Sequence, residues 1–212
     1  MTSPGDRPLQ PAPDERRRRL VRHFAATVEP LLTAGRSYPE LSVRELIATA
    51  GISRSTFYAY FADKAALLEA MADDASHEVF EAAETWFALD RPARRADFDR
   101  ALEPLFAAYA EHQVLFRAIA DTAAQSPAAR RNLERIVQRA ADRLAAHIAT
   151  QQARGHAAPG DPRATAGWLA WMVERGLYQL VPGADEEERA ALHRSMSDVA
   201  WRALYAGADV AD

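Results

Sequence analysis

The stretch that decides the fold is residues 42–64, which read SVRELIATAGISRSTFYAYFADK. Its pattern predicts a helix, a tight turn and a second helix, over residues 43–50 and 54–60. Ser42 and Ser53 stand just before the two helices, where a side-chain oxygen caps free backbone N–H groups. Gly51 between them can take the positive φ that ends a helix in a sharp turn. Phe57 and Phe61 are four residues apart, so both face the core.

The outward face of the second helix carries groups that suit DNA. An Arg, short hydroxyls and a Tyr at the start of a short helix match base edges and phosphates in a major groove. Tyr58 and Tyr60 cannot both join the core that the two Phe rings occupy. Lys64 begins the following helix, where a cation opposes the helix dipole, and a phosphate contact would explain it. From these residues alone, a plain amphipathic helix pair with a surface tyrosine remains the alternative.

The same stretch closely resembles the DNA-binding domain of the TetR family, whose signature is Ala-Gly-(Val/Ile)-Ser-x-x-Thr-(Phe/Leu)-Tyr-x-(Tyr/His)-Phe-x-x-Lys. The matching residues are Ala50, Gly51, Ile52, Ser53, Thr56, Phe57, Tyr58, Tyr60, Phe61 and Lys64. The resemblance implies a transcriptional repressor that binds a near-palindromic operator. It indicates that the DNA-binding residues are Arg44, Ser53, Arg54, Ser55, Thr56, Tyr58, Tyr60 and Lys64.

Three features depart from the family pattern. Ile47 stands where the family usually has a small Ala, so we expect altered helix packing there. Pro30 lies near the end of the first expected helix and should bend or end it, because proline removes a backbone donor. The loop from Gly35 to Leu41 is slightly longer than usual.

The 212 residues carry a net charge of −4, but the charge is unevenly distributed. Residues 1–64 have nine Arg and one Lys against seven acids, or +3, which leaves −7 for the rest. This division is typical of a protein that meets phosphate with one end only. The basic run Arg16–Arg19 is either a solvated helix end or an arm along the DNA backbone.

Apolar spacing of three and four residues predicts an all-α protein of about nine helices, with no sheet. The expected helices cover residues 15–33, 43–50, 54–60, 64–88, 95–111, 113–124, 127–154, 162–180 and 185–206. We divide the chain into a disordered tail (1–14), a helix-turn-helix DNA-binding domain (15–62) and a ligand-binding and dimerisation domain (63–212). The absence of Cys, of a secretory signal and of an apolar membrane span makes a cytoplasmic location the expectation.

The last two expected helices, 162–180 and 185–206, carry more apolar surface than a single small domain can bury. Trp168, Trp171, Met172 and Leu177 cover nearly every face of the first of them. A helix that is apolar all round is buried on all sides. These two helices therefore predict a homodimer joined as a four-helix bundle.

All four Trp lie in the second domain, among aromatic residues spread over separate helices. Over residues 112–114, 153–159, 171–178 and 201–207 this domain is similar to the mycobacterial ethionamide-resistance repressors, a subgroup with a long apolar ligand tunnel. The similarity indicates a pocket for a small hydrophobic effector that releases DNA, although ordinary core packing is the alternative for any single residue. The expected wall is Phe98, Leu102, Leu105, Phe106, Tyr109, Val137, Ala140, Leu144, Met172 and Trp201. Ala170 and Val173 stand where the subgroup has tunnel asparagines, which indicates a more apolar pocket.

Nothing in the sequence indicates catalysis, a cofactor or a metal. No two of the six His have metal-ligand spacing on a helix, and no nucleophile elbow or phosphate-binding loop occurs. Glu174 and Arg175 form either a structural ion pair or a relay of ligand occupancy. A helical interaction module that has lost DNA binding is the remaining competitor, against which the intact motif with Lys64 argues.

Overall fold

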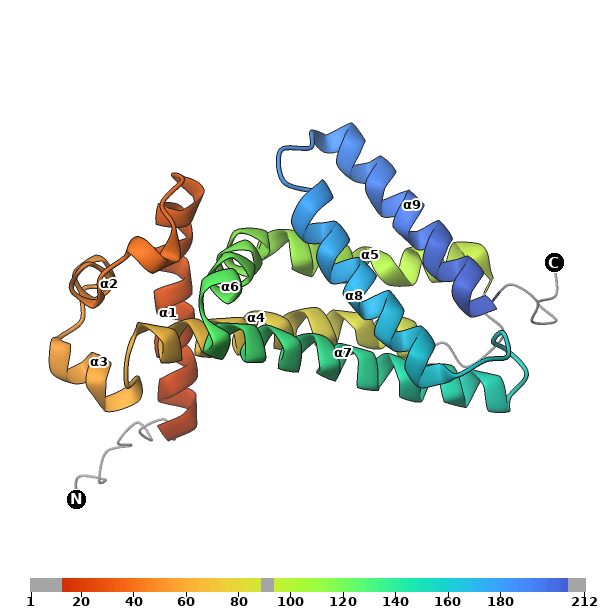
Figure 1. The fold of residues 1–212 in the computed structure, drawn as a ribbon, viewed down its shortest axis with the longest axis horizontal. Coiled ribbons are helices and arrows are strands. Elements are labelled where there is room, and N and C mark those ends of the chain that lie inside the picture. The colour runs from red at the N-terminus through yellow and green to blue at the C-terminus, as the bar shows by residue number, and fades with distance from the viewer. Residues whose placement is uncertain (1–12, 89–93, 206–212) are drawn as a thin grey trace, which may run out of the picture. The chain divides into compact units, whose positions relative to one another are not determined.

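The computed structural model describes residues 13–88 and 94–205, and within these ranges every regular element is a helix (Figure 1). The all-α prediction is therefore confirmed. The helices are α1 Pro13–Thr33, η1 Tyr38–Glu40, α2 Val43–Ala50, α3 Arg54–Tyr60, α4 Lys64–Phe87, α5 Arg95–Glu111, α6 Gln113–Gln125, α7 Pro127–Ala153, α8 Pro162–Leu180 and α9 Glu186–Tyr205. None of the described helices is both long enough and apolar enough to cross a membrane.

The helix ends follow the local capping signals closely. Four helices have the bounds expected from the sequence, and the ends of α4, α6, α7 and α9 differ by one residue. α1 begins at Pro13, inside the segment predicted to be a tail; residues 1–12 lie outside the described part of the chain. α1 does not end at Pro30 but continues to Thr33. The Pro30 carbonyl still accepts from the Ala34 backbone N–H at 3.0 Å, because proline lacks a donor but keeps its acceptor.

The chain divides into two compact units, residues 1–74 and 75–212, and the division falls inside α4. The first unit is built on a cluster of three buried rings. Phe24 of α1 meets Phe57 and Phe61 edge-on, with ring centroids 5.8 and 5.9 Å apart. This packing holds α3 by its inner face and leaves the opposite face in solvent.

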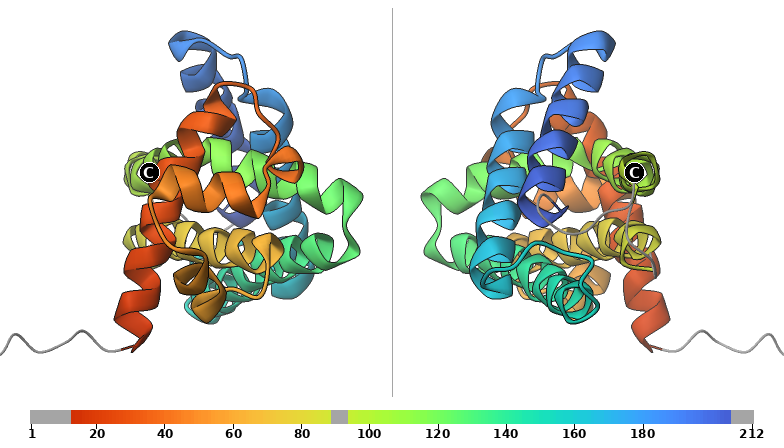
Figure 2. Two further views of the ribbon diagram at one scale, coloured as in Figure 1. Left: turned by 90° about the vertical axis from the view of Figure 1, so that its left-hand side faces the viewer. Right: turned by 90° about the vertical axis from the view of Figure 1, so that its right-hand side faces the viewer.

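The second unit contains the rest of α4 and the helices α5 to α9. α7 packs against α6 and α8, and α5 packs against α9. Figure 2 shows α8 and α9 running side by side along one edge of this unit. Its buried aromatic cluster joins Trp86, Phe98 and Tyr205 from three helices, and the Trp86 indole N–H donates to the Tyr205 hydroxyl at 3.1 Å.

His147 of α7 lies inside this cluster, 5.4 Å from the Trp86 ring and 5.1 Å from the Phe87 ring. Burial first, and then the Arg154 charge, lower the pKa of His147 to about 4. The imidazole is therefore neutral at pH 7 and belongs to the apolar core rather than to a charged site.

Candidate DNA interface and ligand cavity

The N-terminus of α3 is organised by Ser53. Its Oγ accepts from the Thr56 backbone N–H at 3.0 Å and lies 2.9 Å from Ser55 Oγ and 2.8 Å from Thr56 Oγ1. Gly51, with φ 65°, ends α2 in the left-handed conformation and allows the sharp turn between α2 and α3. The result is a cluster of exposed hydroxyls at the free end of a short helix.

Arg54 and Tyr58 form a pair on the exposed face of α3. The guanidinium carbon of Arg54 lies 5.4 Å from the centre of the Tyr58 ring. Tyr58 is 46% exposed and rests edge-on against Phe57, with ring centroids 5.2 Å apart. The buried Phe57 thus fixes the base of Tyr58, while its hydroxyl end remains available to a partner.

The first turn of α2 is held by a reciprocal cap. Glu45 Oε2 accepts from the Ser42 backbone N–H at 2.8 Å, and Arg36 Nη2 lies 3.3 Å from Glu45 Oε1. The hydrogen bonds from Ser42, followed by the one from Arg36, lower the pKa of Glu45 to about 2. Arg44, one residue earlier, is exposed on the surface of α2.

Lys64 has partners that its position in the sequence did not reveal. Its Nζ donates to the carbonyl oxygens of Pro39 at 2.5 Å and Leu41 at 2.9 Å. The Tyr38 hydroxyl in turn donates to the Lys64 carbonyl at 2.6 Å, and Tyr38 is only 2% exposed. These contacts account for a cation at the start of α4, so no phosphate is needed to explain it. Sequence reasoning missed Tyr38, whose only signal was an aromatic residue in an otherwise polar loop.

The eight predicted DNA-binding residues thus differ in exposure. Six are exposed, namely Arg44, Ser53, Arg54, Ser55, Thr56 and Tyr58. Tyr60 and Lys64 are half-buried. Tyr60 lies beside the buried Phe61, with ring centroids 6.5 Å apart.

A Lys64→Ala substitution is expected to destabilise the first unit, because two loop carbonyls lose a charged donor. Hydrogen bonds to charged groups contribute about 1.5–3 kcal/mol, and we expect a loss of that size in the free energy of unfolding. Denaturant unfolding, followed by far-UV circular dichroism, measures it. Arg44→Ala removes an exposed cation of the same unit and should change stability by less than about 0.5 kcal/mol. Equal stabilities for the two variants would contradict the structural role of Lys64.

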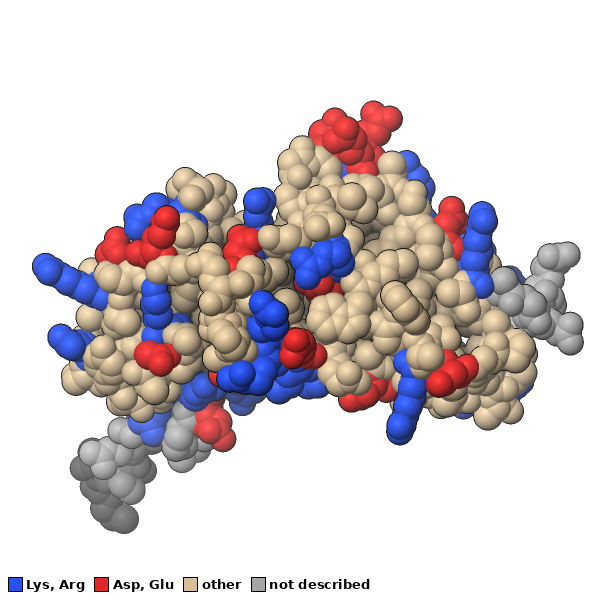
Figure 3. Space-filling model, in the orientation of Figure 1, with Lys and Arg blue, Asp and Glu red and all other residues tan. Residues whose placement is uncertain are grey.

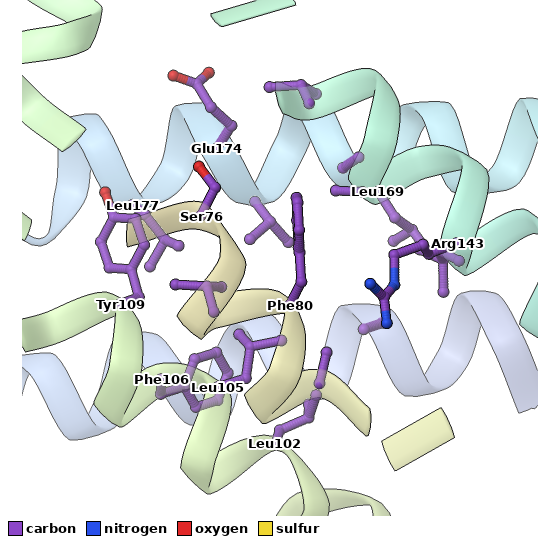
Figure 4. A pocket seen from close by; sticks show the side chains of 18 of the residues that line it. Ser76, Phe80, Leu102, Leu105, Phe106, Tyr109, Arg143, Leu169, Glu174 and Leu177 are labelled. Carbon is purple, nitrogen blue, oxygen red and sulfur yellow. The ribbon is translucent and has the colours of Figure 1, made fainter. Parts of the chain in front are cut away.

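The second unit contains a partly open cavity of about 210 Å³ (Figure 4). Its walls come from α4 to α9 and are mostly aliphatic and aromatic. They are formed by Ser76, Val79, Phe80, Ala83, Trp86, Phe87, Phe98, Leu102, Leu105, Phe106, Tyr109, Phe116, Leu133, Ile136, Val137, Ala140, Arg143, Leu144, Leu169, Ala170, Val173, Glu174, Leu177, Tyr178, Met196 and Ala200. A largely apolar hollow with a few polar groups is the usual form of a small-molecule site.

Eight of the ten residues expected in the pocket line this cavity, namely Phe98, Leu102, Leu105, Phe106, Tyr109, Val137, Ala140 and Leu144. The other two do not. Met172 lies on the outer side of α8, 37% exposed. Trp201 packs instead on Phe98 and Tyr205, with ring centroids 5.5 and 4.7 Å away.

The second half of α4 was expected to reach the pocket, but none of its residues was among the expected wall residues. Ser76, Phe80, Ala83 and Phe87 all line the cavity. Their spacing of four, three and four residues places them on one face of the helix. That spacing was a usable signal, but the same pattern also fits an ordinary core face.

Two charged residues lie in the cavity wall among the described residues, Glu174 of α8 and Arg143 of α7. Arg143 forms an ion pair with Glu84, and its guanidinium carbon lies 5.7 Å from the Phe80 ring centre. Glu174 Oε2 is 3.6 Å from Arg175 Nε. The Arg175 side chain is half exposed whereas that of Glu174 is 16% exposed, so this is not a fully buried ion pair. Burial, the stronger influence, raises the pKa of Glu174, and the Arg175 charge lowers it.

No group of three or more His, Cys, Asp or Glu side chains that could hold a metal ion occurs within residues 13–88 and 94–205. The described residues offer two sites with the character of binding surfaces, namely an exposed helix end with Arg and hydroxyl groups in one unit and a largely apolar cavity in the other.

A helix-turn-helix unit followed by a hollow helical domain defines the class of ligand-binding transcriptional regulators. Residues 32–71 match the family profile described as bacterial regulatory proteins, tetR family, and residues 98–206 match that of the C-terminal domain of transcriptional regulator EthR. The chain belongs to the TetR family of transcriptional regulators, with a C-terminal domain of the EthR type. It is a regulator and not an enzyme, as the motif indicated.

Individual relatives agree with this assignment. The HTH-type transcriptional regulator EthR of Mycolicibacterium smegmatis is 31% identical over 160 residues, which is 74% of this chain and 70% of that protein. A TetR-family regulator from Mesorhizobium loti has the same fold, with a TM-score of 0.70 at 21% identity over 92% of this chain and all of that one. The TetR-family regulator PfmR of Thermus thermophilus has a TM-score of 0.65 at 18% identity, over 84% of this chain and 97% of PfmR.

Proposed function

We propose that the chain represses transcription by binding a near-palindromic operator as a homodimer, and that a small hydrophobic molecule in the cavity releases it from DNA. Regulators of this family bind operator DNA and act as dimers with small-molecule effectors. The observation that carries the proposal is the apolar cavity of the second unit, one wall of which is the helix that also begins in the DNA-binding unit.

α4 is the element through which occupancy would reach DNA. Its residues from Ser76 to Phe87 line the cavity, and its first residue, Lys64, is hydrogen-bonded to the loop around η1. An effector that displaces the cavity face of α4 therefore also displaces the end that carries the helix-turn-helix. In a dimer this changes the distance between the two α3 helices, which must match the spacing of two half-sites.

The energy required is within reach of a modest apolar ligand. Moving a dimer from almost fully competent to almost fully incompetent takes about 5.5 kcal/mol of differential affinity. Burial of about 200 Å² of apolar surface at about 25 cal/mol per Å² contributes about 5 kcal/mol. A dimer has two cavities, and each ligand needs to supply only part of this differential affinity. The burial free energy that differs between the DNA-binding and the released state can therefore be smaller than the total burial free energy of one ligand.

The proposed dimer interface is the exposed apolar face of α8 and α9. Six large hydrophobic side chains are exposed among the described residues, and all but Tyr58 lie on these two helices. They are Trp168 (81%), Trp171 (41%), Met172 (37%), Leu180 (59%) and Val199 (48%). Figure 3 shows that the surface over α8 and the adjoining part of α9 is mostly free of charged side chains, apart from a basic group over the upper part of α8. Apolar patches of this kind mark sites of protein association.

Two measurements test the proposal. Selection of bound sequences from random DNA identifies the operator and should return an inverted repeat. A thermal-shift screen of apolar compounds then identifies occupants of the cavity, and each hit is retested for release of that operator. Compounds that raise the melting temperature but never change operator affinity would contradict ligand control while leaving DNA binding intact.

The Arg54–Tyr58 pair predicts two different effects on DNA binding. Tyr58→Ala should weaken binding to all sequences, and each lost phosphate contact should reduce the log–log salt slope by about 0.9. Arg54→Ala or Thr56→Ala should instead alter base preference, by about 1–3 kcal/mol per lost base contact. Salt-dependent fluorescence anisotropy on the selected operator and on unrelated DNA separates the two effects.

Tyr58→Phe is the matched control, because it keeps the ring under Arg54 and removes only the hydroxyl. If the hydroxyl meets phosphate, this variant reproduces most of the loss of Tyr58→Ala. A Tyr58→Ala, Arg54→Ala double variant with wild-type affinity and salt slope would remove these residues from the interface.

A further inference from the structure

The basic run at the start of α1 contains two arginines without a partner. Arg19 forms an ion pair with Glu15, one turn earlier on the same helix. Arg16 and Arg18 are exposed, and within the described part of the chain neither forms a hydrogen bond or an ion pair. These two guanidinium groups are therefore available to a partner outside the chain.

Both cations stand where the helix itself disfavours them. α1 begins at Pro13, so Arg16 closes its first turn, where the helix dipole opposes a positive charge. Arg18 is four residues before Arg22, and like charges at this spacing repel. For Lys64, at the start of α4, the structure provides two loop carbonyls as acceptors. Within residues 13–88 and 94–205 it provides none for Arg16 and Arg18, so an external anion is the partner that would offset their cost.

The start of α1 lies against the end of α3. The guanidinium carbon of Arg17 is 5.7 Å from the ring centre of Phe61, the residue that caps α3, and Figure 1 shows the first turns of α1 beside this end of α3. The seven residues of α3 span about 10 Å at about 1.5 Å per residue. The major groove is about 12 Å wide, so a helix whose start meets base edges has its other end close to the flanking phosphates.

We propose that Arg16 and Arg18 bind the phosphate backbone that flanks each half-site, so that the start of α1 is a second DNA contact beside α3. This inference rests on the proposed operator binding and extends its interface. Arginine suits the role because its planar guanidinium group donates two parallel N–H bonds to phosphate. Phosphate contacts position a protein but do not read sequence directly, so this surface contributes affinity and register while α3 supplies sequence preference.

An Arg16→Gln, Arg18→Gln double variant measures these contacts through salt dependence. Two lost contacts in each subunit of the dimer should lower the log–log salt slope by about 3.6, at about 0.9 per contact. Between about 50 and about 200 mM salt, the ratio of wild-type to variant affinity should therefore shrink by about a hundredfold. Fluorescence anisotropy should give the same change in slope on the selected operator and on unrelated DNA, because both carry the same phosphates.

The length of the flanking DNA gives a second test on the wild-type chain. Removing base pairs outside the two half-sites removes the phosphates that α1 would bind, so wild-type affinity should decrease toward that of the double variant. The double variant should lose little on the same shortened DNA. Changing the sequence of the flanks at constant length should leave affinity unchanged. A preference for A·T pairs in the flanks that requires Arg16 and Arg18 would indicate minor-groove reading and overturn the phosphate assignment.

The charge-matched control is an Arg131→Gln, Arg163→Gln double variant. Both arginines are exposed and lie in the second unit, on α7 and α8. This control changes the net charge by the same amount and should keep the wild-type salt slope. The Arg16, Arg18 variant should be at least as stable as the wild type in denaturant unfolding, because it loses cations that the helix start disfavours. Unfolding would then not account for its weaker DNA binding.

The outcomes separate this inference from the function on which it rests. A wild-type salt slope in the Arg16, Arg18 variant overturns the α1 contact and leaves operator binding by α3 standing. An equal loss of slope in the control also overturns it, because total charge and not its place on α1 would then set the slope. If the wild-type chain selects no sequence from random DNA, the proposed operator binding itself fails. A lowered slope in the first variant alone, with wild-type affinity that depends on flank length, supports the proposal.

Discussion

An Ala140→Trp variant is expected to lose all response to effectors and to remain in one DNA-binding state. Ala140 lies in the cavity wall on α7, so an indole at this position occupies much of the 210 Å³. Hydrophobic compounds that stabilise the wild-type chain should then produce no thermal shift. Operator affinity of the variant should be constant across effector concentrations, whether the filled state is the competent or the released one.

Overpacking a core costs about 1–3 kcal/mol, so the melting temperature of Ala140→Trp must be measured alongside its binding. Ala146→Trp is the matched control, because it introduces the same side chain on the same helix at an exposed position outside the cavity wall. It should keep both ligand binding and operator release. If Ala140→Trp unfolds, Ala140→Phe fills less of the space and tests the same point. An Ala140→Trp variant that folds and still releases DNA on effector addition would exclude this cavity as the switch.

A Trp168→Arg variant is expected to sediment as a monomer of about the 23.4 kDa chain mass, where the wild type sediments at about twice that value. Trp168 is 81% exposed on α8, so its replacement removes few contacts within the chain and should barely affect folding. Across the proposed interface, in contrast, an arginine would be placed opposite an apolar partner surface and lose its hydration. Large aromatic side chains also account for most of the binding energy of typical interfaces.

Operator affinity should decrease when the dimer dissociates. Two linked heads gain a factor of about 10²–10⁴ over one, and a monomer loses that gain. Ala149→Arg adds the same charge at an exposed position on α7 and should leave both the mass and operator affinity unchanged. A Trp168→Arg variant that still sediments as a dimer would place the interface elsewhere. A wild-type chain that is monomeric at micromolar concentration would contradict the homodimer itself.

The secondary structure and the family of this protein were determined by short-range features of its sequence. Ser42, Gly51 and Ser53 act within three or four residues of themselves, so the bounds of α2 and α3 could be predicted from the chain alone. The helix-turn-helix motif is equally local, and it was sufficient to place the chain in its family. Eight of the 26 residues in the cavity wall were also expected, all of them on α5 and α7, and it was the family resemblance that indicated them.

Other properties depend on segments that are distant in the sequence. The position of Lys64 in the sequence predicts a phosphate ligand. In the structure its ammonium group instead donates to the loop carbonyls of Pro39 and Leu41, more than twenty residues earlier in the chain. Trp201 was expected in the pocket wall, but in the structure it packs against the rings of Tyr205 and Phe98.

The sequence by itself therefore determined which segments are helices, where they end and which motif they carry. Only the tertiary structure decided which residues of α4 line the cavity, that Met172 faces outward and that Trp201 packs on Phe98 and Tyr205. The physical reason is that a cap depends on bonds between near neighbours in the chain. The side of a helix that faces a cavity depends instead on how several helices pack, and an apolar face with a period of 3.6 residues suits a solid core, a cavity or a partner subunit equally well.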